Sequence, residues 1–390
     1  MITRLRQSLG RVKNGWVKKP PANPGLRFNR PLLLFQSDDW GRVGVRDSDG
    51  VEELRVAGIN LGEKPYDFYS LERAEDLQAL SEVLRRHRDS VGCTPSIVMN
   101  FIMANVDFQG SLGARDGHIS LKPLTEGLPG SWHRPQLFEA FRQGVSERLF
   151  FPALHGLSHF CEQAISRELK AGGQRAQFVT TLWQAQTPYI HWRMPWIGYE
   201  YWDPEAAAHA RFLSLDDQRA VIRRAAEIFQ TFFGAGALSA CAPGYRANSD
   251  TRQAWFEAGV RVAQNGPGGQ SAPYLDERGM LLTFRNVEME PATTKCDIAD
   301  LMQQAERCFA TQIPAVVSIH SINFHSTIRD FRTPTLALLD EFLTAVEKKW
   351  PNVLYVHDAD LFHIATEGVY VAGNENVRVT VTAAPEGSRA

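Results

Sequence analysis

Three groups of polar residues, far apart in the sequence, each come directly after a short apolar run. Asp38 and Asp39 follow one run, His155 follows a second and His320 follows a third. Such runs, separated by helical patterns, are typical of parallel strands joined by crossover helices. Because the carboxyl ends of the strands of a parallel barrel open on one face, these residues could converge there.

The types and spacing of these residues suit a metal site. His155 and His159 are four residues apart, so a single turn could present both imidazoles to one ion. Two histidines and one aspartate leave an open position on Zn²⁺, and a neighbouring carboxylate could serve as a base. Each pattern alone has an alternative interpretation: the histidines as core residues of a turn, and the aspartates as a helix cap or turn.

The order of the motifs resembles that of a known family. The stretches Asp38-Asp39, His155-x-x-x-His159, Pro243-Gly244-Tyr245 and Ser318-Ile319-His320 resemble the motifs of the polysaccharide deacetylase superfamily of metal-dependent carbohydrate esterases. The likeness is greatest to a little-characterised bacterial subgroup with a Ser-Asp-Asp-Trp-Gly first motif, and it covers roughly residues 32–356.

The resemblance implies an α/β fold, a distorted (β/α)7 barrel, with one divalent metal. Asp39, His155 and His159 would hold the metal, with Zn²⁺ expected and other transition metals as alternatives. Asp38 would be the general base and His320 the general acid. The backbone N–H of Tyr245 could help to stabilise the oxyanion.

This sequence departs from the family pattern at two points. Cys241-Ala242-Pro243 stands where well-known members carry Arg-x-Pro, so the arginine that orients the base is missing. Arg246 or Arg285 could replace it. The carboxylate that usually tunes the acid histidine is also not identifiable.

Residues near these motifs are expected to bind substrate. They are Trp40, Tyr245, Arg246, Arg285, Asn286, Glu290 and Asn323. The alternative for the stretch 285–291 is a salt-bridged strand edge. The aromatic stretch 183–202 could wall a glycan cleft or form a lid over the barrel. His191 is interpreted as structural, and His325 as a surface residue or a residue behind the ligands.

The elements that must position these residues alternate along the chain. Strands are predicted at 31–37, 96–102, 149–154, 238–242, 260–264, 281–284, 314–319 and 353–356. Helices are predicted at 71–88, with Ser70 as its cap, and at 136–148, 216–233, 249–258, 297–310 and 333–349. We predict a catalytic barrel over 28–367 and a tail over 368–390 with one strand at 377–381.

Residues 1–27 form a predicted basic arm and linker. Apolar residues recur every three or four positions from Ile2 to Trp16, and eight basic residues precede the first acidic one, Asp38. A helix of this kind over 1–19 could lie on the inner face of the cell membrane. The alternative is that it docks on protein.

Composition limits the class of protein. The chain has 390 residues, 44% hydrophobic and 22% charged, with a net charge of −2. This balance excludes a disordered or collagen-like protein, and no basic excess indicates nucleic acid. Five scattered cysteines fit a reducing compartment, and no export signal is apparent, so a cytoplasmic location is predicted.

The leading hypothesis is a metal-dependent hydrolase that removes an acetyl or formyl group from the nitrogen of a sugar during surface-polysaccharide biosynthesis. The substrate would be nucleotide-linked, lipid-linked or an oligosaccharide. Two alternatives stay open. One is a metal-independent glycoside hydrolase that uses a carboxylate pair such as Asp38 and Glu290. The other is a sugar-binding relative without catalysis.

Overall fold

The barrel strands are parallel and separated in sequence by helices. The computed structural model describes residues 25–113, 116–266, 272–373 and 375–383. Within them the main sheet contains β2 (Leu32–Trp40), β3 (Ile97–Ile102), β6 (Phe150–Gly156), β7 (Ser239–Cys241), β8 (Val262–Asn265), β10 (Leu281–Phe284), β11 (Val287–Glu288) and β12 (Ala315–His320). Two further strands join it: β9 (Tyr274–Leu275) is antiparallel to β10, and β13 (Leu354–Tyr355) is parallel to β2.

The strand pairings run round a ring. β2 pairs with β3, and β6, β7, β8 and β10 follow in that order, all parallel. The chain passes from β10 into β11, which pairs with β12, and β12 pairs with β2. β10 is not paired with β11 and pairs instead with β9, so the sheet curls round without closing between β10 and β11. The predicted distorted (β/α)7 barrel is confirmed.

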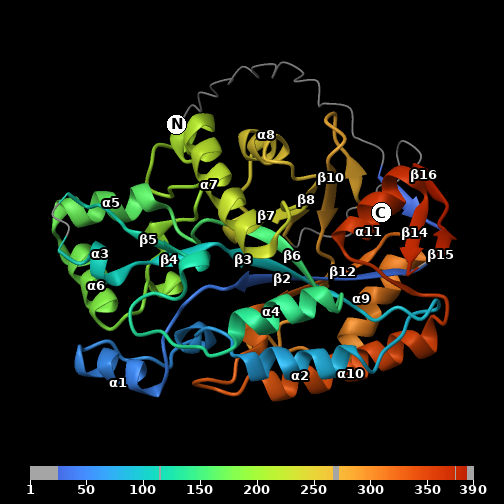
Figure 1. Ribbon diagram of the computed structural model, residues 1–390, viewed down its shortest axis with the longest axis horizontal. Helices are drawn as coiled ribbons and strands as arrows, with labels where there is room; N and C mark the ends of the chain where they lie inside the picture. Colours follow the sequence, from blue (N-terminus) through green and yellow to red (C-terminus); the bar gives the residue numbers. More distant parts are fainter. Residues whose placement is uncertain (1–24, 114–115, 267–271, 374, 384–390) are drawn as a thin grey trace, which may run out of the picture.

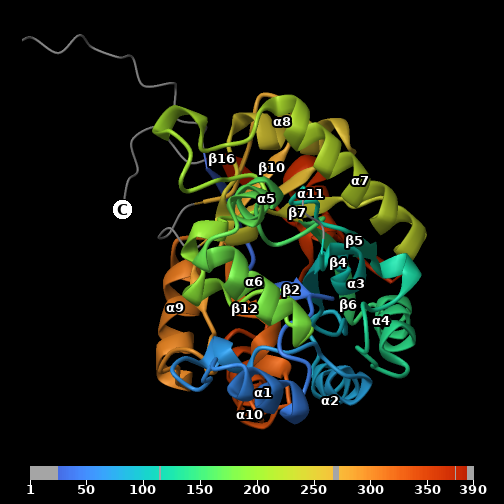
Figure 2. The same cartoon turned by 90° about the vertical axis from the view of Figure 1, so that its left-hand side faces the viewer.

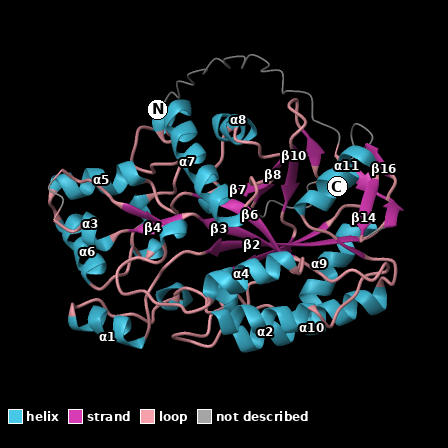
Figure 3. Ribbon diagram, viewed as in Figure 1, coloured by secondary structure: helices cyan, strands magenta, loops and turns pink. Residues whose placement is uncertain are grey.

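Helices cover the outside of this ring (Figures 1 and 3). They are α1 (Ser48–Val56), α2 (Ala74–Leu84), α3 (Phe108–Ser111), α4 (Leu137–Ser146), α5 (Glu162–Ala171), α6 (Gln174–Gln184), α7 (Leu215–Phe233), α8 (Ser249–Glu257), α9 (Ile298–Ala310), α10 (Arg332–Lys349) and α11 (Asp358–Glu367). Figure 2 shows α2, α4, α7, α8, α9 and α10 surrounding the strands. Helices α5 and α6 lie at one end of the molecule and α11 lies at the other (Figure 1).

Local sequence explains the ends of these helices. In α7 the Ser214 hydroxyl accepts from the amide of Asp217, Asp216 and Asp217 lie in the first turn, and Gly234 ends the helix with φ 78°. The predicted helix at 71–88 begins only at Ala74. Ser70 is not its cap, because the Ser70 hydroxyl donates to the Arg46 carbonyl, and Asp76 accepts from the Arg73 amide instead.

The barrel interior changes from apolar to polar along the strands. Leu32 and Leu34 on β2 pack with residues such as Val98, Val316 and Leu354, and Leu361 and Ile364 of α11 complete this cluster. Two residues further along β2, Gln36 reaches across the barrel to Thr283 at 3.2 Å, and Asp38 lies in register with His320. Since alternate residues of a strand share a face, the apolar layer leads directly to a polar layer at the carboxyl ends.

The tail forms more strands than predicted. β14 (Val369–Ala372) pairs with β15 (Glu375–Arg378), and β16 (Val381–Ala383) pairs with β1 (Leu26–Phe28). The strand predicted at 377–381 is divided because Val379 donates instead to the Gly368 carbonyl and Thr380 donates to the Asn29 side chain.

Short elements complete the described chain. They are β4 (Ala104–Val106), β5 (Leu121–Pro123) and the 3₁₀ turns η1 (Pro65–Phe68), η2 (Leu124–Glu126), η3 (His191–Arg193), η4 (Pro195–Ile197), η5 (Ala208–Ala210), η6 (Pro243–Tyr245) and η7 (Ser321–Phe324). The predicted basic arm at 1–19 lies outside the described residues. Among the described helices, none combines the length and apolar character needed to cross a bilayer.

Candidate metal centre and active site

A bulge at the end of β2 directs both aspartates into the site. The pairing of β2 with β3 shifts register between Ser37 and Trp40, and Asp39 has φ 76°. Successive residues of a regular strand point to opposite faces, so an unbroken strand would send one of the two carboxylates out of the barrel. The bulge and the left-handed backbone of Asp39 remove this alternation, as bulges beside active sites do.

Asp39, His155 and His159 form a cluster that fits a metal ion. Their ligand atoms all lie within 4.8 Å of one another. Nε2 of His159 is 3.1 Å from Asp39 Oδ1, and Nε2 of His155 is 3.6 Å from the same atom. Asp39 Oδ1 is buried and has no hydrogen-bond partner among the described residues. A buried carboxylate oxygen that faces only two imidazoles is the arrangement expected of a ligand set.

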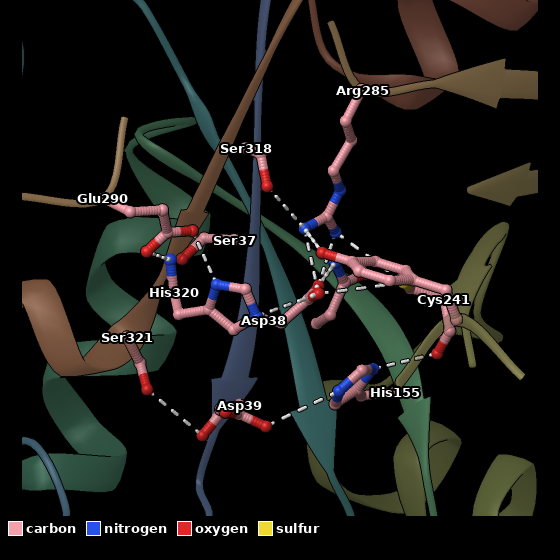
Figure 4. A network of polar contacts seen from close by, with 12 residues as sticks. Ser37, Asp38, Asp39, His155, Cys241, Arg285, Glu290, Ser318, His320 and Ser321 are labelled. Carbon is pink, nitrogen blue, oxygen red and sulfur yellow. Dashed lines mark hydrogen bonds and ion pairs between the residues drawn. The ribbon is translucent and has the colours of Figure 1, made fainter. Parts of the chain in front are cut away.

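The histidines are prepared for this role. Nδ1 of His155 lies 2.9 Å from the carbonyl oxygen of Cys241 and must donate to it, so Nε2 keeps its lone pair towards Asp39 (Figure 4). Burial lowers the pKa of His159 well below its usual value, so this imidazole is neutral. Neutral rings with free lone pairs are the form that binds metal.

Arg42 balances the charge of Asp39. Its Nη2 lies 3.5 Å from Asp39 Oδ2, the oxygen that faces away from the histidines. Burial opposes ionisation of Asp39, but the Arg42 guanidinium helps to hold its pKa well below the usual range. Sequence reasoning missed Arg42, although its position three residues after Asp39 was an available signal.

A second cluster of Asp38, His155 and Cys241 also lies within metal-binding distance. Burial and the nearby Asp38 carboxylate raise the pKa of the Cys241 thiol well above its usual value, so it is not the thiolate that metals bind. Asp38 is already paired with an arginine. The residues therefore favour the Asp39 cluster as the metal centre.

Arg285 replaces the arginine that the Cys241-Ala242-Pro243 stretch lacks. Its Nη1 donates to Asp38 Oδ2 at 2.9 Å, and its Nη2 donates to Asp38 Oδ1 at 2.5 Å. Asn100 donates to the same carboxylate at 2.7 Å. Burial acts to raise the pKa of Asp38, but Arg285 together with His320 and His155 holds it far below the usual range. Asp38 therefore stays ionised.

Glu290 is the carboxylate that sequence reasoning could not assign. Nδ1 of His320 donates to Glu290 Oε1 at 2.6 Å, and Asn323 donates to the other oxygen at 2.7 Å. Although burial opposes the charge, Glu290 raises the pKa of His320 to about 9. The His320 side chain is 25% exposed and its Nε2 lies 3.8 Å from Asp38 Oδ2, whose side chain is 3% exposed. His320 can therefore offer a proton to a group in the cavity.

Glu290→Gln should move the alkaline limb of the pH–rate profile, where activity falls with rising pH, to lower pH. The protonated form of His320 is the acid, so activity falls as pH rises through its pKa of about 9. A neutral glutamine removes the attraction that raises this pKa, and the limb should shift towards about 6.5, the unperturbed value for histidine. A pH–rate profile of both proteins measures the shift. An unchanged alkaline limb would contradict the pairing.

The cluster lies at the base of a cavity of about 360 Å³. Six aromatic residues line it: Tyr66, Tyr69, Tyr189, Trp192, Tyr199 and Tyr245. Three of these come from the stretch 183–202, while Trp183 and Tyr201 of the same stretch are buried in the core. His191, interpreted from the sequence as structural, also lines the cavity, and its Nε2 lies 2.9 Å from the Gly198 carbonyl oxygen.

Several residues expected to bind substrate are placed elsewhere. Trp40 is fully buried, donates to Ser37 and stacks on Phe324, because the bulge turns it outwards into the helical layer. Asn286 is occupied by the backbone of Pro314 and Val316.

Arg246 is exposed, lies over the Trp202 ring and is not among the lining residues.

Other expected substrate contacts act behind the reacting groups. Arg285, Glu290 and Asn323 are buried and hold Asp38 and His320, so they are positioning residues rather than substrate ligands. Tyr245 does line the cavity. Its backbone N–H donates to the Ala242 carbonyl at 2.8 Å, so the expected oxyanion contact from this amide is not available in this structure.

Glu200 anchors the turn between the two histidine ligands. Its Oε1 accepts from the amides of Leu157 and Ser158, both at 2.6 Å. A Cβ on Gly156 would lie 2.2 Å from Glu200 Oε2, so the glycine makes room for this carboxylate. The contact spans the residues between His155 and His159, and sequence reasoning gave no sign of it.

Comparisons with known proteins were made by sequence and by structure. No family model matches the sequence, and no curated protein matches it. Similar solved structures include a Mycobacterium smegmatis protein assigned to the polysaccharide deacetylases, with 11% identity, a TM-score of 0.45, and 89% of this chain and 94% of that chain covered.

A family 4 carbohydrate esterase from Streptomyces lividans has 10% identity and a TM-score of 0.33, with 84% of this chain and 91% of that chain covered. A CE4 family pseudoenzyme from Bacillus anthracis has 9% identity and a TM-score of 0.39, with 86% and 66% covered. Because these identities and TM-scores are low, any functional assignment depends on the geometry of the site.

Proposed function

We propose that this protein is a metal-dependent hydrolase that removes an N-acyl group, acetyl or formyl, from an amino sugar. One observation carries the proposal. The Asp39, His155 and His159 cluster, an ionised Asp38 and a protonatable His320 all line one cavity. This is the set of groups that amide hydrolysis needs: a site for a Lewis acid, a base and an acid.

Different residues of the chain have different roles in this proposed reaction. A divalent ion held by Asp39, His155 and His159, Zn²⁺ being best suited to these ligands, would polarise the acyl carbonyl and acidify a water. Asp38 accepts the proton of the attacking water, and Arg285 keeps it in the basic form. His320 donates a proton to the nitrogen that leaves, and Glu290 keeps it protonated at neutral pH.

The alternative of a metal-independent glycoside hydrolase is less well supported. It needs one carboxyl group as a proton donor and a second as a nucleophile or base. Glu290 accepts from His320 and Asn323, and Asp38 accepts from Arg285 and Asn100. With both carboxylates acting as acceptors, neither is arranged to donate a proton. A sugar-binding role without catalysis leaves the buried, unpaired oxygen of Asp39 unexplained.

The substrate part of the proposal follows from the wall of the cavity. Tyrosine and tryptophan faces pack against sugar rings, and their polar edges can reach hydroxyl groups. The proposed substrates are nucleotide-linked, lipid-linked or oligosaccharide forms of the N-acyl sugar, and the proposed process is the biosynthesis of a surface polysaccharide. Peripheral membrane contact through residues 1–19 belongs to the same proposal.

Removal and return of the metal tests this function. Purified protein should release acetate or formate from the methyl glycoside or nucleoside diphosphate ester of N-acetyl- and N-formyl-glucosamine. Activity should disappear after chelation and return on addition of Zn²⁺, whereas Asp38→Asn should bind the ion without turnover. Turnover that survives complete chelation would refute the mechanism.

A further inference from the structure

The wall of the cavity is continuous along one side. The Tyr66 ring stacks on Tyr69, with centroids 6.1 Å apart, and the Arg42 guanidinium lies 3.8 Å from the Tyr69 ring centroid. Arg42 Nη1 then donates to the Tyr189 hydroxyl at 3.3 Å. These contacts join the segment after β2 to the segment between α6 and α7.

The same wall continues on the other side. His191 stands edge-on to Tyr189 at 6.5 Å and stacks on Tyr199 at 4.6 Å. A Cβ on Gly244 would lie 2.3 Å from the Tyr199 ring, so the Gly244 backbone lies against that ring. Next to Gly244, the Tyr245 hydroxyl accepts a hydrogen bond from Arg285 at 3.0 Å. Arg285 also donates to Asp38, so these contacts connect the wall with the residues around Asp38.

An ion pair between the buried Asp67 and the partly exposed Arg193 joins the two segments. Asp67 is 0% exposed and lies next to Tyr66, whose ring stands edge-on to His320 at 6.5 Å. Its carboxylate accepts from the Trp192 indole at 2.9 Å and from two nitrogens of Arg193 at 3.0 Å each. A bidentate pair of this kind fixes the relative position of the two segments that carry Asp67 and Arg193. Trp192 itself lines the cavity.

We infer that the site accepts a single N-acyl sugar unit, at the end of a glycan or in a small conjugate, and excludes the interior of a long chain. This inference rests on the proposed function. A chain bound along its length needs an entry and an exit on opposite sides of the reacting groups, and along this wall, from Tyr66 through Tyr189 to Tyr245, the lining residues instead contact one another or the segments beside them. The volume of about 360 Å³ is near the lower end of the range for small-molecule sites, about 300–1,000 Å³.

Oligosaccharides of defined length test this inference on the wild-type holoenzyme. The probes are β-1,4-linked N-acetylglucosamine oligomers of one to five units and the methyl glycoside of the monomer. Mass spectrometry of the products locates each lost acetyl group, and kcat/KM is measured for each length. Only a single or terminal unit should be deacetylated, and kcat/KM should change less than about threefold with length, because no further units are bound.

The outcomes separate the two proposals. Deacetylation of internal units within about tenfold of the terminal rate, or a kcat/KM that rises more than about tenfold with length, would overturn this inference and leave the proposed function intact. Failure to hydrolyse any N-acyl sugar under metal-loaded conditions would overturn the proposed function, and the present inference with it.

Discussion

His159→Gln should abolish metal binding and activity together. His159 offers a neutral imidazole to the cluster, and a glutamine of similar length is a poor zinc ligand. Lewis acidity is worth several kcal/mol at the transition state, so kcat/KM should fall by about 10³-fold or more. Metal content by elemental analysis and turnover of an N-acyl sugar glycoside measure the two effects. The melting temperature of the metal-free protein should change little, because Nδ1 of His159 has no partner among the described residues.

Asp39→Asn provides a second test of the same cluster. It removes the charge from a ligand but keeps its shape, and metal affinity should fall here as well. This variant also leaves Arg42 buried without its carboxylate, so a loss of stability is expected in addition. Asp49→Ala, an exposed position in the first turn of α1, is the matched control and should change neither property. Full metal occupancy with retained activity in both cluster variants would remove the basis of the proposed function.

Arg285→Met should be the most destabilising substitution at the site. Arg285 is 0% exposed and forms two hydrogen bonds with Asp38. Removing one partner of a buried ion pair leaves a buried charge and typically lowers the free energy of unfolding by about 3–5 kcal/mol. The pKa of Asp38 should rise as well, because burial then acts without the opposing arginine. A protonated Asp38 cannot accept the proton of water, so activity at neutral pH should fall by about 10²-fold or more.

Denaturant unfolding and a double variant separate stability from catalysis. In Asp38→Asn with Arg285→Met the carboxylate that Arg285→Met leaves unpaired is gone, so part of the lost stability should return, while activity stays absent. The control is Arg246→Met, at the exposed arginine that the sequence alone allowed as an equal candidate. It should change the free energy of unfolding by no more than about 0.5 kcal/mol. If Arg246→Met and Arg285→Met behaved alike, the assignment of Arg285 to the base would be wrong.

Local patterns in the sequence were sufficient to predict parallel strands joined by helices, whereas the (β/α)7 barrel was implied by the resemblance to the polysaccharide deacetylases. Apolar runs such as 314–319 become parallel strands because both of their faces are buried. The position of His320 directly after that run was enough to place it at the carboxyl end of the barrel. For the same reason, the order of apolar runs and polar residues alone predicts that three distant segments converge on one face.

The partners of the catalytic groups could not be read from the sequence. Arg246 and Arg285 were equally acceptable replacements for the missing arginine, and only the structure places Arg285, two residues beyond the inward-facing Thr283 of β10, 2.5 Å from Asp38. Glu290 pairs with His320 across 30 residues of sequence, and Arg42 reaches Asp39 from a loop. Contacts of this kind depend on how strands and loops are placed in three dimensions, which residue types do not specify.

The sequence by itself determined which residue types stand at the ends of the strands, and therefore the chemistry that is available to the protein. The tertiary structure decided where those side chains point. An unbroken β2 would turn either Asp38 or Asp39 away from the barrel interior, and the bulge that admits both of them also turns Trp40 out of the cavity into the core. The pairing of β2 with its neighbours sets that bulge, because a register shift is a property of two strands together.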